Sequence, residues 1–209
     1  MKNGHVRWFF KIAFFMSAIL VAKLCKFSPI LGSFTAFFSG INVILPLSGA
    51  FMGIAGSSLL SLILIVIHAC LHGFSFPLHY AAYHIPGLFA SFYWATRSVL
   101  IRILLPLACI IAFIAHPIGA EAWAYSLFWF IPVIIYFNNY NSLFAQALGS
   151  TFIAHGVGSV IWIYTVPMFA TQWLALIPIV LIERILFALC MVIMHGIISY
   201  TFSVFKSLK

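Results

Sequence analysis

The sequence predicts an all-α, polytopic integral membrane protein: a single domain, residues 1–209, forming a helical bundle of about six to seven transmembrane helices. Of the 209 residues, 65% are hydrophobic and only 6% are charged. A soluble domain carries about 25% charged residues, so this chain has too few charges to cover a surface in water. The surrounding medium is therefore predicted to be a lipid bilayer, with no separate soluble domain.

Apolar runs divide the chain into candidate helices joined by short connections. In chain order these runs cover residues 8–24, 39–55, 57–71, 98–116, 122–137, 147–167 and 173–199. Backbone groups in lipid must pair within their own segment, which predicts helices rather than strands. Residues 85–95 form a weaker apolar stretch, which we interpret as an interfacial or re-entrant helix.

The second and third runs nearly touch at a glycine-rich stretch. Gly49, Gly53 and Gly56 are three or four residues apart and form a strip without side chains, where another backbone can approach closely. The stretch predicts a tight helical hairpin or a broken helix. Both helix packing and the close approach of a ligand are compatible with such a strip.

The basic residues lie mainly toward the chain ends and in short connections. Those at the two ends are Lys2, Arg7, Lys11, Lys206 and Lys209. Lysine and arginine stay on the cytoplasmic side of membrane proteins, so both termini are predicted to be cytoplasmic, an orientation that Lys23 and Lys26 oppose. Such scattered cations do not form a nucleic-acid interface. Short loops and the absence of a cleavage site after the first run favour a multi-pass protein of the bacterial inner (plasma) membrane.

Residues that bind metals or cofactors are sparse. The four cysteines lie far apart, so no metal ribbon or redox motif is formed. His68 and His72 have the spacing of a metal-binding pair, but no third ligand is near. We therefore predict no metal and no cofactor. The histidine-rich connection from His72 to Pro86 is interpreted as a lid over one membrane face.

Two charged residues stand near the middle of the last run. Placing Glu183 and Arg184 in lipid costs about 2.5–3.5 kcal/mol each, so they are expected to face the protein interior or a cavity. Helical spacing places Arg184 on one face with Ala188, Met191 and His195. That face is either a ligand site or part of a packing ion pair, in which Glu183 contacts Arg97 or Arg102.

A second polar stripe runs along residues 147–167. It consists of Thr151, His155, Gly158 and Trp162. Polar, small and aromatic side chains on one face can line a cavity and stack on a planar ligand. A histidine whose hydrogen bonds are satisfied between helices is the alternative interpretation.

Catalysis has little support in the sequence. An intramembrane hydrolase would need Ser48 with His155 or His195 as the base, but Ser48 lacks the preceding glycine of the familiar nucleophile motif. Glu121 and Glu183 lie in different contexts and predict no carboxylate pair. We expect no catalytic residues, and hence no enzyme.

The order of features resembles the substrate-binding S component of an energy-coupling factor (ECF) transporter. Ala18 and Ala22 match the Ala-x-x-x-Ala strip of that family's first helix, and LGSFTAFFSGINVILPLSGAFMGIAG is similar to its loop and second helix. The resemblance covers about the first 75 residues. It implies six helices, cytoplasmic termini and packing of Ala18 and Ala22 on a transmembrane coupling subunit. Because the chain has no phosphate-binding loop, separate ATPase chains are expected.

Together these features predict the substrate-capture subunit of a larger transporter, which takes up a small, vitamin-like or otherwise planar solute. The predicted substrate-binding residues are Asn42, Thr151, His155, Trp162, Glu183 and Arg184. Arginine suits bidentate binding of a carboxylate or phosphate. An assembly or scaffold subunit without a ligand is the main alternative, and an intramembrane hydrolase is a third.

Overall fold

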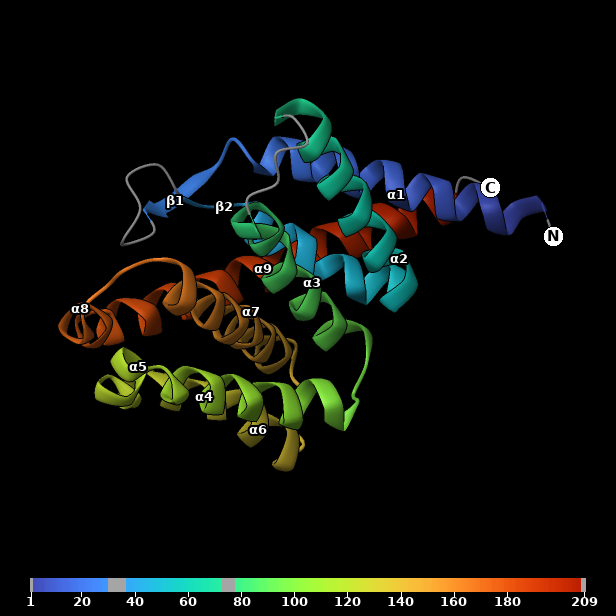
Figure 1. Cartoon of the computed structure of the whole chain (residues 1–209). Helices are drawn as coiled ribbons and strands as arrows, with labels where there is room; N and C mark the ends of the chain where they lie inside the picture. Colours follow the sequence, from blue (N-terminus) through green and yellow to red (C-terminus); the bar gives the residue numbers. More distant parts are fainter. Residues whose placement is uncertain (1, 30–36, 73–77, 208–209) are drawn as a thin grey trace.

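The computed structural model describes residues 2–29, 37–72 and 78–207, which form a bundle of helices with one small hairpin (Figure 1). The first elements are α1 (Lys2–Ala22), β1 (Lys26–Pro29), β2 (Phe37–Ser39), α2 (Ile41–His72) and α3 (Leu78–Ala95). A π-helical segment η1 (Leu100–Leu104) continues into α4 (Leu105–Ala115), followed by α5 (Pro117–Glu121). A 3-10 segment η2 (Trp123–Trp129) leads into α6 (Phe130–Phe137), and the chain ends with α7 (Leu143–Thr165), α8 (Ala170–Ala175) and α9 (Ile177–Ser207).

The helical class is confirmed, with one exception. Strands β1 and β2 pair in antiparallel fashion, Lys26 opposite Ser39, just before α2. This short hairpin lies outside the apolar runs for most of its length and leaves the predicted all-α class unchanged.

Within the described residues, three helices are long and apolar enough to cross a membrane. They cover Ile41–Leu71, Leu143–Thr165 and Ile177–Ser207. Shorter apolar helices cover Trp8–Ala22, Leu100–Ala115 and Trp123–Phe137. A hydrocarbon core about 30 Å thick needs about 20 helical residues, so the three long helices have the dimensions of membrane spans.

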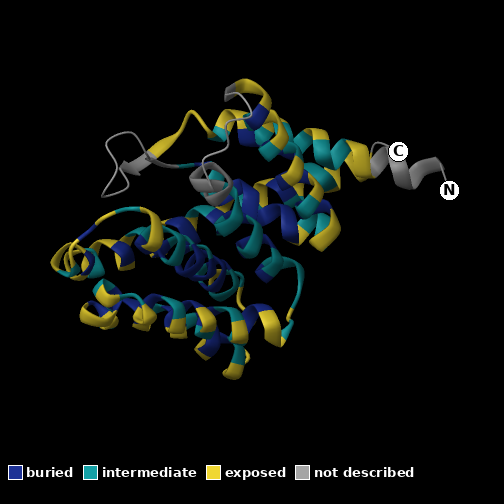
Figure 2. Ribbon diagram, viewed as in Figure 1, coloured by how far each residue is buried: buried dark blue, intermediate teal, exposed yellow. Residues whose placement is uncertain are grey.

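Around the middle of α9 the exposed side chains are apolar and the charged one is buried. Ile182 and Ile193 are 60% and 62% exposed, whereas Arg184 is only 3% exposed. The same mixture of exposed positions on outer helix faces and buried ones toward the bundle interior is visible along the other helices (Figure 2). A helix in water has the opposite arrangement, so this pattern indicates lipid contact.

Helix α2 is broken at Gly53, which confirms the predicted break and places it at the middle glycine of the strip. The backbone there has φ 68° and ψ −171°, a conformation that glycine adopts without steric cost. A break leaves the last carbonyls of the first half without helical donors. Lys11 Nζ donates to the carbonyl oxygen of Phe51 at 2.6 Å, so this lysine, expected only to orient the chain, also supports the break.

Helix α3 lies inside the bundle, in contact with both α2 and α7. Ala90, Ser91 and Tyr93 have no exposed surface. Residues 85–95, interpreted from the sequence as an interfacial or re-entrant helix, thus form the second half of a helix that packs inside the bundle. A side chain at Gly49 would overlap the backbone carbonyl of Ser91, so Gly49 permits the close approach of α2 and α3. At this glycine the packing interpretation is confirmed.

Both chain ends lie at one end of the bundle, and the hairpin, α5 and α8 lie at the other (Figure 1). The rings of Phe10 and Phe205 are 4.6 Å apart, which joins the start of α1 to the end of α9. Phe51 contacts His195, and His195 stacks on Trp94 with ring centroids 5.6 Å apart. The break in α2 and the end of α3 therefore belong to the same end as the termini, which we call the terminal end.

Candidate functional site

A buried polar cluster lies between η2, α7 and α9. The η2 segment contributes Tyr125 and Trp129, both at most 3% exposed. His155 and Ser159, one turn apart on α7, are also buried. Arg184 of α9 lies close enough to interact electrostatically with Tyr125 and His155. The structure thus brings together His155 and Arg184, two of the predicted substrate-binding residues.

The hydrogen bonds of His155 define which ring nitrogen carries the proton. Trp129 Nε1 donates to His155 Nδ1 at 3.0 Å, so Nδ1 is an acceptor. A neutral ring then carries its proton on Nε2, which donates to the hydroxyl oxygen of Tyr125 at 2.7 Å. The Tyr125 hydroxyl also lies 3.4 Å from Ser159 Oγ, a contact in which either oxygen can donate. The result is a hydrogen-bonded chain from Trp129 to Ser159 with both ring nitrogens of His155 occupied.

Replacing Trp129 with phenylalanine is expected to lower the free energy of unfolding by about 1–3 kcal/mol, because the buried Nδ1 of His155 loses its donor. The substitution should also allow the imidazole proton of His155, which is on Nε2 in the wild type, to occupy Nδ1 instead. Thermal unfolding in detergent and 15N NMR of the histidine ring measure these two effects.

Trp173→Phe is the matched control for this variant. Trp173 packs against the same Tyr125 ring at 5.0 Å and is 2% exposed. Within the described residues its indole N–H has no hydrogen-bond partner. A wild-type tautomer in Trp129→Phe, or equal loss of stability in both variants, would contradict the assigned hydrogen-bond direction.

Glu183 and Arg184 form an ion pair with each other. Arg184 Nη2 lies 3.4 Å from Glu183 Oε2, with side chains 4% and 17% exposed. The alternative pairing of Glu183 with Arg97 or Arg102 is wrong, because Arg102 is bonded to carbonyl groups and to Gln146. The guanidinium also lies 4.8 Å from the centre of the Phe187 ring. A long, flexible arginine thus reaches a neighbour whose Cα–Cβ direction differs by about 100°.

The predicted Arg184 face of α9 is confirmed as a buried face. Ala188 and Met191 are 0% and 1% exposed. His195, at the end of this face, is half-buried between the rings of Trp94 and Phe51. This packing shows how a histidine is accommodated in an apolar helix.

The other predicted contacts lie in different surroundings. Thr151 is buried and donates to the carbonyl of Leu148 in its own helix. Trp162 is partly buried, and its indole N–H has no hydrogen-bond partner among the described residues. Asn42 donates to the Ser39 carbonyl at the start of α2 and belongs to the end of the bundle that carries the hairpin. The six residues therefore do not form a single contact group.

The alanine strip of α1 faces the protein's own helices over part of its length. Ala18 and Ala22 are half-buried and pack against the core around Phe15 and Ile19. A Cβ at Gly40 would meet Ala22 at 2.8–3.1 Å, so the two residues are in close contact. Other residues of this chain therefore already cover part of each alanine.

The remaining predictions concern the lid, the histidine pair and the hydrolase. In the predicted lid, residues 73–77 and the side chains of residues 72–83 lie outside the described residues, while the backbone of residues 78–86 forms the first half of α3. The His68 ring lies 6.1 Å from that of His84.

Ser48 Oγ donates to the Leu45 carbonyl, while His155 is bonded to Tyr125 and Trp129, so the proposed nucleophile and base are not brought together. Among the described residues, no three His, Cys, Asp or Glu side chains are placed to hold a metal ion.

Sequence reasoning missed Tyr125 and Trp129. Both have apolar rings and lie in an apolar run, so hydropathy counts them with the lipid-facing residues. The available signal was their spacing of four residues, which places two polar-tipped aromatic side chains on one helical face. Pairing that face with the His155 stripe would have predicted the cluster.

No family model, no curated protein and no solved structure matches this chain.

Proposed function

We propose that this chain is the solute-capture subunit of a membrane transporter, similar in role to an S component. The single observation that carries this proposal is the Glu183–Arg184 pair, buried within a helix whose outer face is apolar. Ionisable residues at such a depth are costly, and in membrane proteins they commonly mark a solute or ion pathway. The adjoining Tyr125, His155 and Ser159 extend the polar region across two further elements.

In this proposal the chain crosses a bacterial inner membrane about six to seven times. The three long spans and three shorter apolar helices supply six candidates, and the break at Gly53 divides the first long span into two. Coupling and ATPase subunits are separate chains, and part of the Ala18–Ala22 strip contacts the coupling subunit. The energy for uptake comes from those partners.

Arg184 is the proposed contact for an anionic group on the solute. A carboxylate or phosphate competes with Glu183 for the guanidinium, whose flat, forked geometry suits two parallel hydrogen bonds. Trp162 supplies an aromatic surface and an available N–H, and Thr151 a hydroxyl on the same helix. The solute class is therefore a small planar anion.

Ligand retention tests this function. The full chain is purified gently from its native membrane, and bound small molecules are identified by mass spectrometry. We expect a planar anion on the wild type and at least about tenfold less in Arg184→Lys, which keeps the charge and loses the forked geometry. The control Lys206→Gln removes an exposed cation of α9 and should retain the wild-type amount. An empty wild type, or equal retention in Arg184→Lys, contradicts the proposal.

A scaffold subunit without a ligand is the second candidate, and one observation favours it. Both ring nitrogens of His155 already bind groups of this chain, as expected of a residue that locks helices together. In that case Arg184→Lys would change the recovery of partner chains on purification while no small molecule is retained by the wild type. The same preparation therefore separates the two functions.

A further inference from the structure

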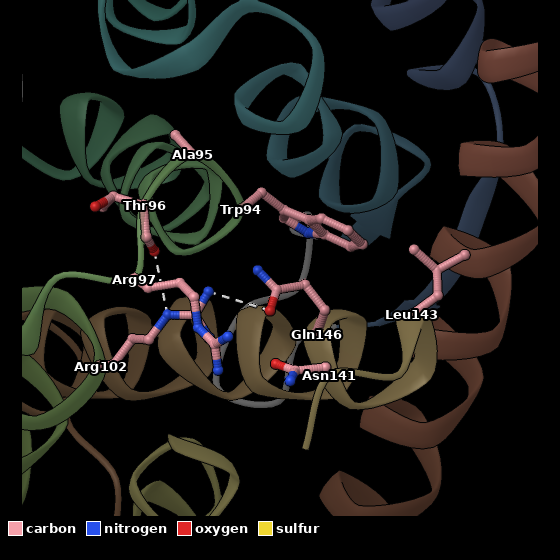
Figure 3. A pocket seen from close by; sticks show the side chains of 8 residues that line it. All are labelled: Trp94, Ala95, Thr96, Arg97, Arg102, Asn141, Leu143 and Gln146. Carbon is pink, nitrogen blue, oxygen red and sulfur yellow. Dashed lines mark hydrogen bonds between the residues drawn. The ribbon is translucent and has the colours of Figure 1, made fainter. Parts of the chain in front are cut away.

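An open pocket of about 300 Å³ lies at the terminal end, where α3 ends and α7 begins (Figure 3). Trp94, Arg97 and Arg102 line it from the α3–η1 side, and Asn141 and Gln146 line it from the start of α7. None of these residues belongs to the Glu183–Arg184 cluster. A volume of this size is at the lower end of small-molecule sites.

Arg102 is buried and held in one orientation. It is 1% exposed, and its Nε donates to the Thr96 carbonyl at 3.1 Å. Nη2 donates to the carbonyl of Tyr93 at 2.9 Å and to Gln146 Oε1 at 3.1 Å, while the guanidinium lies over the Tyr93 ring at 4.1 Å. All of these partners are uncharged. Within the described residues Nη1 has no hydrogen-bond acceptor, so one end of the fork is available.

The chain supplies no acidic side chain to this pocket. Its only two acids are Glu121 and Glu183. Glu183 pairs with Arg184, and Glu121 ends α5, beyond the far end of the η1–α4 segment that begins beside Arg102. Arg97 is exposed and lies close enough to Arg102 for the two charges to repel. Two neighbouring cations therefore face an open pocket without a counter-charge, and an anion from outside would relieve their repulsion.

The position of the pocket indicates which anion is available. By chain position, six of the ten basic residues belong to this end: Lys2, Arg7, Lys11, Arg97, Arg102 and Lys206. Such an excess predicts the cytoplasmic face, where the leaflet carries anionic lipid. Trp94 is an aromatic residue of the kind found at membrane interfaces, and its buried N–H has no hydrogen-bond partner among the described residues. The pocket also adjoins the first turn of α7, a helix end that favours negative charge.

We propose that this pocket binds a phosphate group, with Arg97 and the free edge of Arg102 as its cationic contacts. The phosphate belongs either to an anionic phospholipid of the cytoplasmic leaflet or to a soluble phosphate ester. This site is separate from the proposed solute site and does not depend on it.

Native mass spectrometry of the full chain, with lipid added in detergent, tests the proposal. The probes are phosphatidylglycerol, with phosphatidylcholine as the zwitterionic control, and glycerol phosphate as a soluble competitor. We expect preferential binding of phosphatidylglycerol by the wild type and at least about a tenfold loss in Arg97→Gln, since a charge-assisted hydrogen bond to phosphate is removed. Arg97 is exposed, so this variant should fold. Lys206→Gln, which removes an exposed cation at the same end but outside the pocket, should bind like the wild type.

The competition identifies the source of the phosphate. Lipid binding that persists in excess glycerol phosphate assigns the pocket to a lipid headgroup, and displacement assigns it to a soluble ester. Equal binding of the two lipids by the wild type, or equal losses in Arg97→Gln and Lys206→Gln, would overturn the proposal. Failure of this test leaves solute retention at Arg184 unaffected, because that measurement uses a different site and a different ligand.

Discussion

Gly49→Ala is expected to prevent recovery of a stable, monodisperse protein in detergent. The added Cβ overlaps the backbone carbonyl oxygen of Ser91, so α2 and α3 must move apart. Ser91 is fully buried, and the displaced atoms are backbone rather than the end of a flexible side chain. Overpacking of a core usually lowers the free energy of unfolding by about 1–3 kcal/mol. A clash with backbone atoms is expected to lower it by at least the upper value. Size-exclusion profiles and thermal unfolding provide the measurement.

Gly196→Ala and Gly158→Ala are the controls for this substitution. A Cβ at Gly196 meets nothing within 4 Å, and one at Gly158 lies 3.6 Å from Pro86, an ordinary contact. Alanine is favoured over glycine within a helix by about 1 kcal/mol, so both controls should match or exceed the wild-type stability. A normal elution profile for Gly49→Ala would show that α2 and α3 are not as close as described.

Arg184→Met is expected to lower the free energy of unfolding by about 3 kcal/mol. Removing one member of a buried ion pair costs about 3–5 kcal/mol, and the partial exposure of Glu183, at 17%, places the effect at the lower end of that range. The double variant Glu183→Gln/Arg184→Met removes both charges and should recover most of this loss. Denaturant titration in micelles compares the single and double variants. Equal destabilisation of the two would mean that the pair contributes no coupling energy.

Hydropathy was a reliable guide to the segments that contact lipid. The long apolar runs became α2, α7 and α9, because burial of backbone polar groups in helices is a local requirement that each run satisfies alone. Local signals also explain two boundary errors. The run 173–199 begins in α8, which ends at Ala175, and α9 starts at Ile177, since Pro178 suits the first turn of a helix. It continues to Ser207, and the hydroxyls of Thr201, Ser203 and Ser207 are satisfied there by carbonyl groups of the preceding turn.

Features that depend on contacts between distant segments escaped prediction. Helix α3 has low hydropathy, yet it is central because Gly49 lets α2 approach and Ser150 donates to its Ala90 carbonyl. The pocket at Arg102 forms only where three elements meet. Gln146, which lines it, belongs to no sequence motif that would predict a pocket. The ion-pair partner of Glu183 could not be predicted either. The rotation of about 100° between adjacent helical residues gives the direction of each Cβ atom, but it does not say how far the long side chain of Arg184 can reach.

The adjacency of Glu183 and Arg184 has a consequence for biogenesis. Since both charges belong to one helix, their pairing needs no other part of the protein and can form while α9 is still a nascent segment. The paired side chains then leave the translocon with no net charge between them, and the two separate insertion penalties of about 2.5–3.5 kcal/mol are reduced before the bundle assembles. Two charges on separate helices would each have entered the bilayer alone.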